Sequence, residues 1–421
     1  MTESTAAAPF LVGPWRAGDQ RVLNDWIAEL VAAVDTDRAT LHPTLAALRA
    51  TVLRDPARFM LMHQMLEQVP QQPPYDTTPF GDAQVRDFDH LLALINHVLT
   101  RAPAFNKTGL VGLPINALLD WAIGTPAGFA AFIDPVINGH LKEILNAWGQ
   151  FLVSPASCHV LGAEQHSGWF GADARAAMPR FEQDFVCDPA LPWHGFSSWD
   201  DFFTRRWRPG VRPVAAPDDD EVINNACESA PYRLDRGVAR HARFWIKAQP
   251  YSLEHMLDRH PLAPQFFGGT VYQAFLNAHS YHRWHSPVNG TVVATHRIDG
   301  SYYAARPGQG FDDCAPRQSQ AYIAQMATRA LIFIQADHPA IGLLCVMPVG
   351  MAEISSCDVT VQPGQRVRKG EQLGMFHFGG STHCLMFGPQ VALEFDLRGQ
   401  QPGLESEPIP INAHLARIRR A

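Results

Sequence analysis

The chain lacks several features that would place it in a familiar class of protein. Its 421 residues contain no long uninterrupted apolar run, no excess of basic residues and no C-x-x-C cysteine pair. The net charge of -7 does not indicate a protein that binds nucleic acid or anionic lipid, because such binding needs a basic surface. The seven cysteines are scattered and odd in number, which is typical of reduced thiols and predicts a cytoplasmic protein. The first residues have neither a basic start nor an apolar core, so no signal peptide is expected.

A membrane-spanning helix is also not expected. Such a helix needs roughly 18 or more continuous apolar residues. The nearest candidate covers residues 109–133, where Asp120 is the only charge but Pro114, Gly124 and Pro126 interrupt the run. Because proline and glycine break a continuous helix, we predict two buried helices around a turn and no membrane association.

What is present indicates a globular protein with two kinds of structure. Hydrophobic residues make up 46% of the chain and charged residues 18%, enough for large cores. Apolar residues recur at helical spacing in the first part, over residues 23–34, 88–98 and 137–151. From about Trp193 the apolar segments become short and β-branched, as strands are, at 221–223, 290–294 and 331–334. We predict an α+β protein with a helical domain over 1–187 and a β-rich domain over 188–421.

The motif Gly379-Gly380-Ser381-Thr382 contains a bond that can cleave itself. The Ser381 hydroxyl can attack the Gly380 carbonyl and convert the amide to an ester. Elimination and hydrolysis then leave a pyruvoyl group, a ketone that condenses with amines and accepts electrons as pyridoxal phosphate does. Glycine before the serine tolerates backbone strain and leaves room at the carbonyl. On its own the motif also fits an ordinary turn.

Self-cleavage requires a base, and the segment Tyr281–His285 supplies histidines. With His279, the residues His282 and His285 form H-x-x-H-x-x-H, which also fits a metal site or a structural role. No cysteine or acidic ligand lies nearby at metal spacing, so we expect acid–base work and no metal. Glu228, in a loop after a predicted strand, is the candidate carboxylate that orients the base, although such a residue is more often solvated surface.

Four motifs in order resemble the phosphatidylserine decarboxylase family over roughly residues 193–400. They are Asp201-Phe202-Phe203-Thr204-Arg205-Arg206, Arg212-Pro213-Val214, Tyr281-His282-Arg283-Trp284-His285 and Gly379-Gly380-Ser381-Thr382. The segment 361–374, with expected turns at Pro363-Gly364 and Lys369-Gly370, resembles lipoyl and biotinyl domains and implies a barrel-sandwich element.

The resemblance implies a role for each matching residue. Ser381 matches the serine that becomes the pyruvoyl group, and Gly380 contributes the carbonyl that is attacked. Gly379 and Thr382 are expected to contact the new group. His285 matches the histidine of an Asp-His-Ser triad, and His282 a histidine linked to decarboxylation. Glu228 stands where the family has aspartate. Cleavage between Gly380 and Ser381 would give fragments 1–380 and 381–421, which are expected to stay associated.

The departures from the family pattern resemble its soluble, amino-acid-specific branch. Ser280 replaces the common aspartate, and Ala226-Cys227-Glu228-Ser229 replaces a Pro-Ala-Asp-Gly phrase. The implied activity is pyruvoyl-dependent decarboxylation of a free aromatic amino acid such as L-tryptophan, without pyridoxal phosphate. The alternatives are phosphatidylserine decarboxylation at a membrane, an uncleaved binding protein and a zinc hydrolase. Oligomeric state does not follow from the sequence.

Overall fold

The helices and strands are described from a computed structural model. It describes residues 17–36, 39–70, 85–106, 113–242, 251–276, 280–305, 319–353, 356–378 and 381–419. The predicted residues His279, Gly379 and Gly380 lie outside this described part of the chain.

Helices dominate the first 203 residues, and several begin at a proline. The longer ones are α1 (Ala17–Thr36), α2 (Pro43–Arg54), α3 (Pro56–Glu67), α4 (Phe88–Val98), α5 (Pro114–Ile123), α6 (Pro126–Ile133) and α7 (Pro135–Leu152). Short helices follow as η1 (Pro155–Val160), α8 (Ala172–Ala177), α9 (Phe181–Asp184), η2 (Pro192–Gly195) and α10 (Trp199–Phe203). Proline suits a first helical position because its missing N–H would have no partner there. Asp55 and Asp134 cap α3 and α7 by accepting backbone N–H bonds.

The strands form one large sheet and two small ones. The seven-stranded sheet has the order β2-β3-β11-β7-β6-β5-β9, and the small sheets are β4-β10-β8 and β1-β13-β12. Their bounds are β1 (Val222–Asn224), β2 (Ala230–Arg236), β3 (Thr270–Leu276), β4 (Arg283–His285), β5 (Gly290–Ile298), β6 (Arg329–Ala336), β7 (Leu343–Gly350), β8 (Cys357–Val359), β9 (Arg366–Val367), β10 (Gln372–Phe376), β11 (Ser381–Phe387), β12 (Leu393–Phe395) and β13 (His414–Ile418). Three short helices lie among them, α11 (Leu253–Met256), η3 (Ala263–Phe266) and α12 (Gln320–Met326).

Three buried clusters hold the layers together. The helical core joins the first seven helices to α10 and includes Leu92, Phe132, Trp148, Trp199 and Phe378. The inner core lies on one face of β11 and includes Tyr272, Trp284, Phe376, Leu385 and Phe387. The outer core lies on its other face and includes Phe266, Phe333, Met347, Cys384 and Met386. Successive side chains of β11 enter these two cores in turn, because neighbouring side chains of a strand point to opposite faces.

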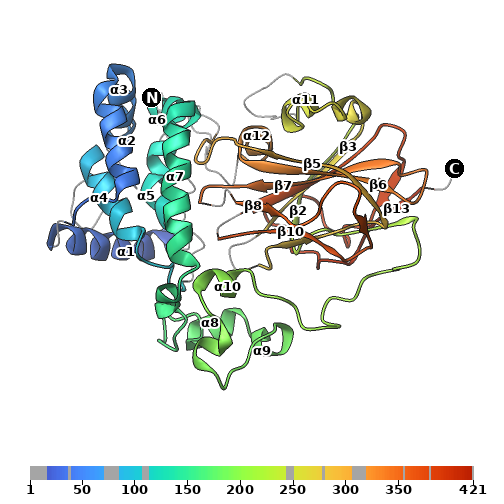
Figure 1. Ribbon diagram of the computed structural model, residues 1–421, viewed down its shortest axis with the longest axis horizontal. Coiled ribbons are helices and arrows are strands. Elements are labelled where there is room, and N and C mark those ends of the chain that lie inside the picture. Colours follow the sequence, from blue (N-terminus) through green and yellow to red (C-terminus); the bar gives the residue numbers. More distant parts are fainter. Residues whose placement is uncertain are drawn as a thin grey trace, which may run out of the picture.

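Helices α1 to α7 stand as a block beside one end of the large sheet (Figure 1). Several contacts join the two parts: Asn138 of α7 accepts a hydrogen bond from the Tyr302 backbone at 3.1 Å, and Trp148 touches Phe378. Phe378 lies just before the Gly-Gly-Ser motif, so the predicted cleavage site is at this contact between helices and sheet. No helix in the described ranges is long and apolar enough to cross a membrane.

Most predicted elements are confirmed. The helical spacing at 23–34, 88–98 and 137–151 corresponds to α1, α4 and α7. The apolar run ending at residue 133 is α5 and α6 around Gly124-Thr125, as predicted. The predicted strands at 221–223, 290–294 and 331–334 are β1, β5 and β6.

The barrel-sandwich prediction has a mixed outcome. Both expected turns are present, and Gly364 and Gly370 adopt positive φ angles of 85° and 79°. At Gly370 a Cβ would lie 2.4 Å from the Val214 side chain, so only glycine fits. However, β9 pairs with β5 of the large sheet, whereas β10 pairs with β4 and β8. The strands over the described residues therefore form open sheets, and no closed barrel is seen among them.

Candidate active site

Ser381 is the first residue of β11, an interior strand of the large sheet. It pairs with Leu276 of β3 on one side and with Gly350 of β7 on the other. Its side chain is 1% exposed, and its Oγ forms no hydrogen bond with any described residue. A buried hydroxyl without a partner is unusual, because such burial costs roughly 1–3 kcal/mol. No described residue therefore competes for the Ser381 hydroxyl.

Aromatic packing fixes the chain immediately before the motif. The Phe378 ring meets the rings of Trp148 and Trp199 edge-on, with centroids 4.9 and 4.4 Å away. Phe203 of α10 lies 5.6 Å from the same ring. These contacts come from α7 and α10, so the helical part of the chain positions the approach to Ser381.

His282 and Phe378 both pack against Phe203 of α10. It is fully buried, and its ring stacks on Phe203 with centroids 4.1 Å apart. Its backbone carbonyl accepts a hydrogen bond of 2.9 Å from the Phe376 N–H, at the end of β10. Because Phe203 contacts both His282 and Phe378, this histidine packs beside the segment that leads to Ser381.

His285 lies in a different setting. Its Nδ1 is 3.2 Å from Asn412 Oδ1, and its Nε2 is 3.0 Å from the Tyr281 hydroxyl. Asn412 uses its Nδ2 to donate to the Arg212 carbonyl at 3.1 Å, so its oxygen faces the histidine. His285 therefore carries its proton on Nδ1, and Nε2 accepts from Tyr281. Burial, aided by Arg283 and opposed by the Asn412 hydrogen bond, lowers the pKa of His285 to about 4, which keeps the ring neutral.

A cavity of about 320 Å³ opens beside His285. Its described lining includes Arg206, Trp207, Arg212, Tyr281 and Asn412, and none of it comes from β11. His285 and His282 thus point to different surroundings, as expected for side chains three apart at a strand, where neighbours alternate between faces. Among the described residues, which do not include His279, no group of three or more His, Cys, Asp or Glu side chains is placed to hold a metal ion.

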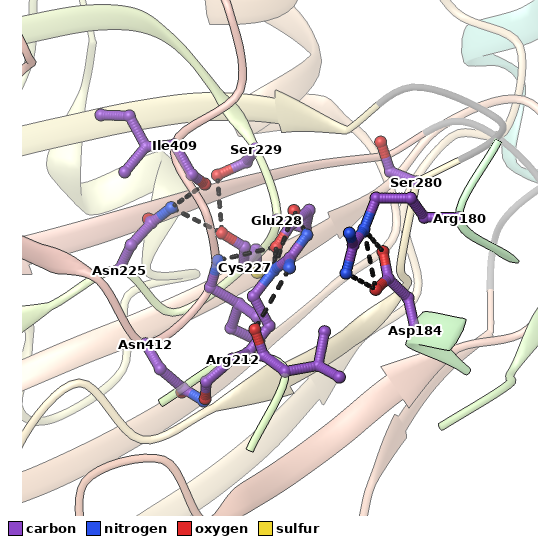
Figure 2. Close-up of polar contacts among 12 residues, drawn as sticks. Arg180, Asp184, Arg212, Asn225, Cys227, Glu228, Ser229, Ser280, Ile409 and Asn412 are labelled. Carbon is purple, nitrogen blue, oxygen red and sulfur yellow. Dashed lines mark hydrogen bonds and ion pairs between the residues drawn. The ribbon is translucent and has the colours of Figure 1, made fainter. Parts of the chain in front are cut away.

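The predicted contact between Glu228 and His285 is not formed. The Glu228 carboxylate instead accepts from Arg212, with Nη2 2.6 Å from Oε1, and from the Ile411 N–H at 2.8 Å (Figure 2). Asn412 takes the place beside the histidine that we assigned to Glu228. The carboxylate is fully engaged by a guanidinium that also stacks on Trp207 at 3.9 Å, so it has no oxygen left to turn toward the ring.

Glu228 still contributes to the same region indirectly. By binding the Ile411 N–H, it fixes the residue next to Asn412. Asn412 has a positive φ of 66°, and its own N–H donates to the Asn225 carbonyl at 2.9 Å. Asparagine tolerates this conformation better than most residues. The ion pair therefore stabilises the turn that presents Asn412 to His285.

Thr382 holds β11 to β3. Its Oγ1 donates to the Ala274 carbonyl at 2.9 Å and accepts from Gln273 Nε2 at 3.0 Å, and the Tyr251 hydroxyl donates to Gln273 in turn. Alternation along the strand places Thr382 on the face opposite Ser381. The contact of Thr382 with the cofactor stays a prediction.

His383 is a candidate that the sequence reasoning missed. It lies two residues after Ser381, on the inner-core face of β11, and is fully buried. Neither ring nitrogen makes a hydrogen bond of ordinary geometry to a described residue, and the ring meets Tyr272 edge-on with centroids 6.1 Å apart. Burial lowers the pKa of His383 to about 4, against a small opposing effect of the Ala274 carbonyl. The period of two along a strand would have identified this histidine.

Comparisons with known proteins identify the family of the chain. Two sequence models described as phosphatidylserine decarboxylase match residues 42–178 and 199–405. The chain is 43% identical over 328 residues to decarboxylase iboD of Amanita muscaria, an alignment that covers 74% of this chain and 92% of that protein. The chain belongs to the phosphatidylserine decarboxylase family.

Within the phosphatidylserine decarboxylase family, other long alignments are with L-tryptophan decarboxylases. The enzyme of Psilocybe cyanescens is 38% identical over 346 residues, covering 77% of each chain. The enzyme of Psilocybe cubensis is 33% identical over 414 residues, covering 92% of this chain and 91% of that one. This member of the family is therefore a decarboxylase close to the tryptophan decarboxylase branch, as the four motifs indicate.

Proposed function

We propose that the protein is a pyruvoyl-dependent decarboxylase of a free aromatic L-amino acid such as tryptophan, matured by cleavage between Gly380 and Ser381. The main support is Ser381, a buried serine that directly follows Gly-Gly and whose hydroxyl forms no hydrogen bond with the described residues. Long alignments with proteins named L-tryptophan decarboxylase support the substrate class. A pyruvoyl group supplies a ketone that condenses with the substrate amine and takes up electrons when carbon dioxide leaves.

The residues around Ser381 fit a group of this kind. The start of β11 is buried, as are His383 on the same face and His282 beside Phe378. A water-poor site favours loss of a carboxylate that is poorly solvated there. Aromatic rings from α7 and α10 pack against Phe378, and we expect this packing to keep water away from that side of the site. Ser381 would carry the group, with Gly379 and Thr382 as its chain neighbours.

We assign the proton transfers to the two predicted histidines. His285, neutral and with its proton on Nδ1, is the proposed base for the Ser381 hydroxyl because it matches the triad histidine of the family. Its described hydrogen bonds are with Asn412 and Tyr281, and the cavity beside it is not lined by β11. Its Nε2 accepts a hydrogen bond from the Tyr281 hydroxyl, so we propose that protons reach or leave His285 through Tyr281. His282 or His285 is the proposed donor of the proton returned to the substrate. Glu228 acts at a distance, by holding Arg212 and the turn at Asn412.

The two products of cleavage would remain together. Residues 381–387 are hydrogen-bonded to β3 and β7, both of which belong to 1–380. Farther on, β13 pairs with β1 of the same fragment. We also propose that the domain division lies after residue 187, between α9 and the first strand, and that the protein acts in the cytoplasm.

The test compares the native protein with a Ser381→Ala variant. Each is incubated with the twenty amino acids, and amines and chain masses are measured. The native protein is expected to show fragments 1–380 and 381–421 and an aromatic amine, and the variant neither. An active protein with an intact 380–381 bond would contradict the proposal. Activity on phosphatidylserine vesicles with none on free amino acids would instead favour the lipid alternative.

A further inference from the structure

A buried carboxyl group lies where the end of β7 meets the helices. Glu353 follows Gly350 by three residues and is 6% exposed. Its Oε1 accepts a 2.7 Å hydrogen bond from the Asn116 N–H in the first turn of α5. The preceding residue, Ala352, donates its N–H to the Tyr302 carbonyl at 3.1 Å. Glu353 is thus held in one place by the backbone of two other segments.

Three polar atoms in this region have no hydrogen-bond partner within the described part of the chain. Glu353 Oε2, Asn116 Oδ1 and the Tyr303 hydroxyl are all buried and form no hydrogen bond with any described residue. Buried polar groups are almost always bonded, because each unbonded group costs roughly 1–3 kcal/mol. Because water does not solvate the buried carboxylate, the pKa of Glu353 is raised to about 7. Two of the three atoms are acceptors, so the group suits a ligand that donates.

The position of Glu353 relates this group to Ser381. Gly350 pairs directly with Ser381 across β7 and β11. Three residues of chain extend at most about 10 Å. The side chain of an aromatic amino acid, measured from its α-carbon to the far edge of the ring, spans most of this distance. The surroundings are apolar: Phe132 lies 6.0 Å from the Tyr303 ring, and Ile115 is buried in the same core.

We infer that Glu353, Asn116 and Tyr303 form the polar end of the substrate side-chain site, and that the substrate is an aromatic amino acid with an N–H or O–H donor on its ring. This inference rests on the proposed function and adds a recognition site to it. Indole fits because it has one donor, no acceptor and a large apolar face. A ring without a donor leaves these acceptors unpaired, and sites built for a hydrogen bond reject such analogues strongly.

The test is a competition between L-tryptophan and its benzothienyl isostere, in which sulfur replaces the ring N–H. Processed protein receives both in equal amounts, and the ratio of the two amines is measured. We expect the native protein to favour tryptophan by about tenfold or more. Glu353→Met, which keeps the length but removes the acceptor, should bring the ratio below about threefold. Glu353→Gln keeps an acceptor oxygen and should retain most of the preference. Glu254→Gln, which changes a carboxylate paired with Arg240, is the matched control.

A second measurement does not depend on cleavage or turnover. In the Ser381→Ala background, tryptophan should raise the melting temperature more than the isostere does, because only a ligand that binds the folded state stabilises it. Adding Glu353→Met should remove the difference. Equal shifts by both amino acids before that change, or an unchanged product ratio in cleaved Glu353→Met, would overturn the inference. If the native protein forms neither amine, the proposed function fails, and the melting shifts alone decide the binding site.

Discussion

Replacing Asn412 by aspartate tests how the protein keeps His285 neutral. Burial lowers the pKa of His285 from 6.5 to about 4, and that difference corresponds to about 3 kcal/mol in favour of the neutral ring. A carboxylate in place of Asn412 Oδ1 would lie near 3.2 Å from Nδ1. An opposite charge at this range raises a histidine pKa by about 1–3 units, which predicts a value of about 5–7. Aspartate tolerates the positive φ at this position as asparagine does.

The pKa is measured by NMR titration of ring-labelled histidine in the uncleavable Ser381→Ala protein, with His285→Gln to assign the signal. The low folded-state pKa means that the unfolded chain binds a proton first. Stability should therefore fall as pH drops from 6.5 toward about 4, and Asn412→Asp should lessen that fall. In a cleavable chain made by cell-free synthesis, self-cleavage should stop below a certain pH, here called the acid limit. That pH should be higher in Asn412→Asp, because the pKa of His285 is higher.

Two results would refute this reasoning. One is an ordinary pKa near 6.5 for His285 in the chain with Asn412, because burial would then not control the ring. The other is an unchanged pKa in a well-folded Asn412→Asp protein. Asn96→Asp on the distant helix α4 is the control for adding a charge, and it should leave both the pKa and the acid limit unchanged.

Three further predictions use urea denaturation of the Ser381→Ala protein. Thr382→Val removes a hydroxyl with two hydrogen bonds and should cost about 1–3 kcal/mol; no loss would mean that these bonds do not stabilise β11. Phe378→Ala opens a cavity between Trp148 and Trp199 and should cost about 3–5 kcal/mol; in the cleavable chain it should also slow cleavage, and normal cleavage would contradict that positioning role. His377 Nδ1 lies 3.0 Å from the Asp200 carboxylate, which raises the pKa of His377. The stability from this ion pair is therefore complete below the ordinary histidine pKa and is lost as pH rises through the raised pKa. The loss of stability caused by His377→Gln should shrink from about pH 6 to pH 9, and a loss that stays constant would show that the pair is not charged.

Local patterns were sufficient to predict much of the fold. The apolar spacing of α1, α4 and α7 is visible in the chain because a helix face repeats every three to four residues. The prolines at 114 and 126 mark the starts of α5 and α6 for a similar local reason. The pairing of β11 between β3 and β7 joins segments far apart in the chain, and no local pattern specifies such an order.

The surroundings of the site depend on contacts that sequence spacing does not encode. Asn412 is 127 residues from His285, and it faces the ring only because Glu228 and Asn225 fix its turn. The sequence pointed to the carboxylate because a histidine base is commonly oriented by one. Glu353 lies 237 residues from Asn116, and nothing in either neighbourhood indicates their contact. His383, in contrast, could have been found from the alternation along β11.

The location of Ser381 within the sheet bears on the working lifetime of the proposed enzyme. A strand bonded along both edges cannot be withdrawn without dismantling the sheet, and its first residue is shut off from bulk water. A reactive end made there could be neither supplied from outside nor replaced after damage. Each molecule would then have a single, unrenewable catalytic group, and only synthesis of a new chain could restore lost capacity.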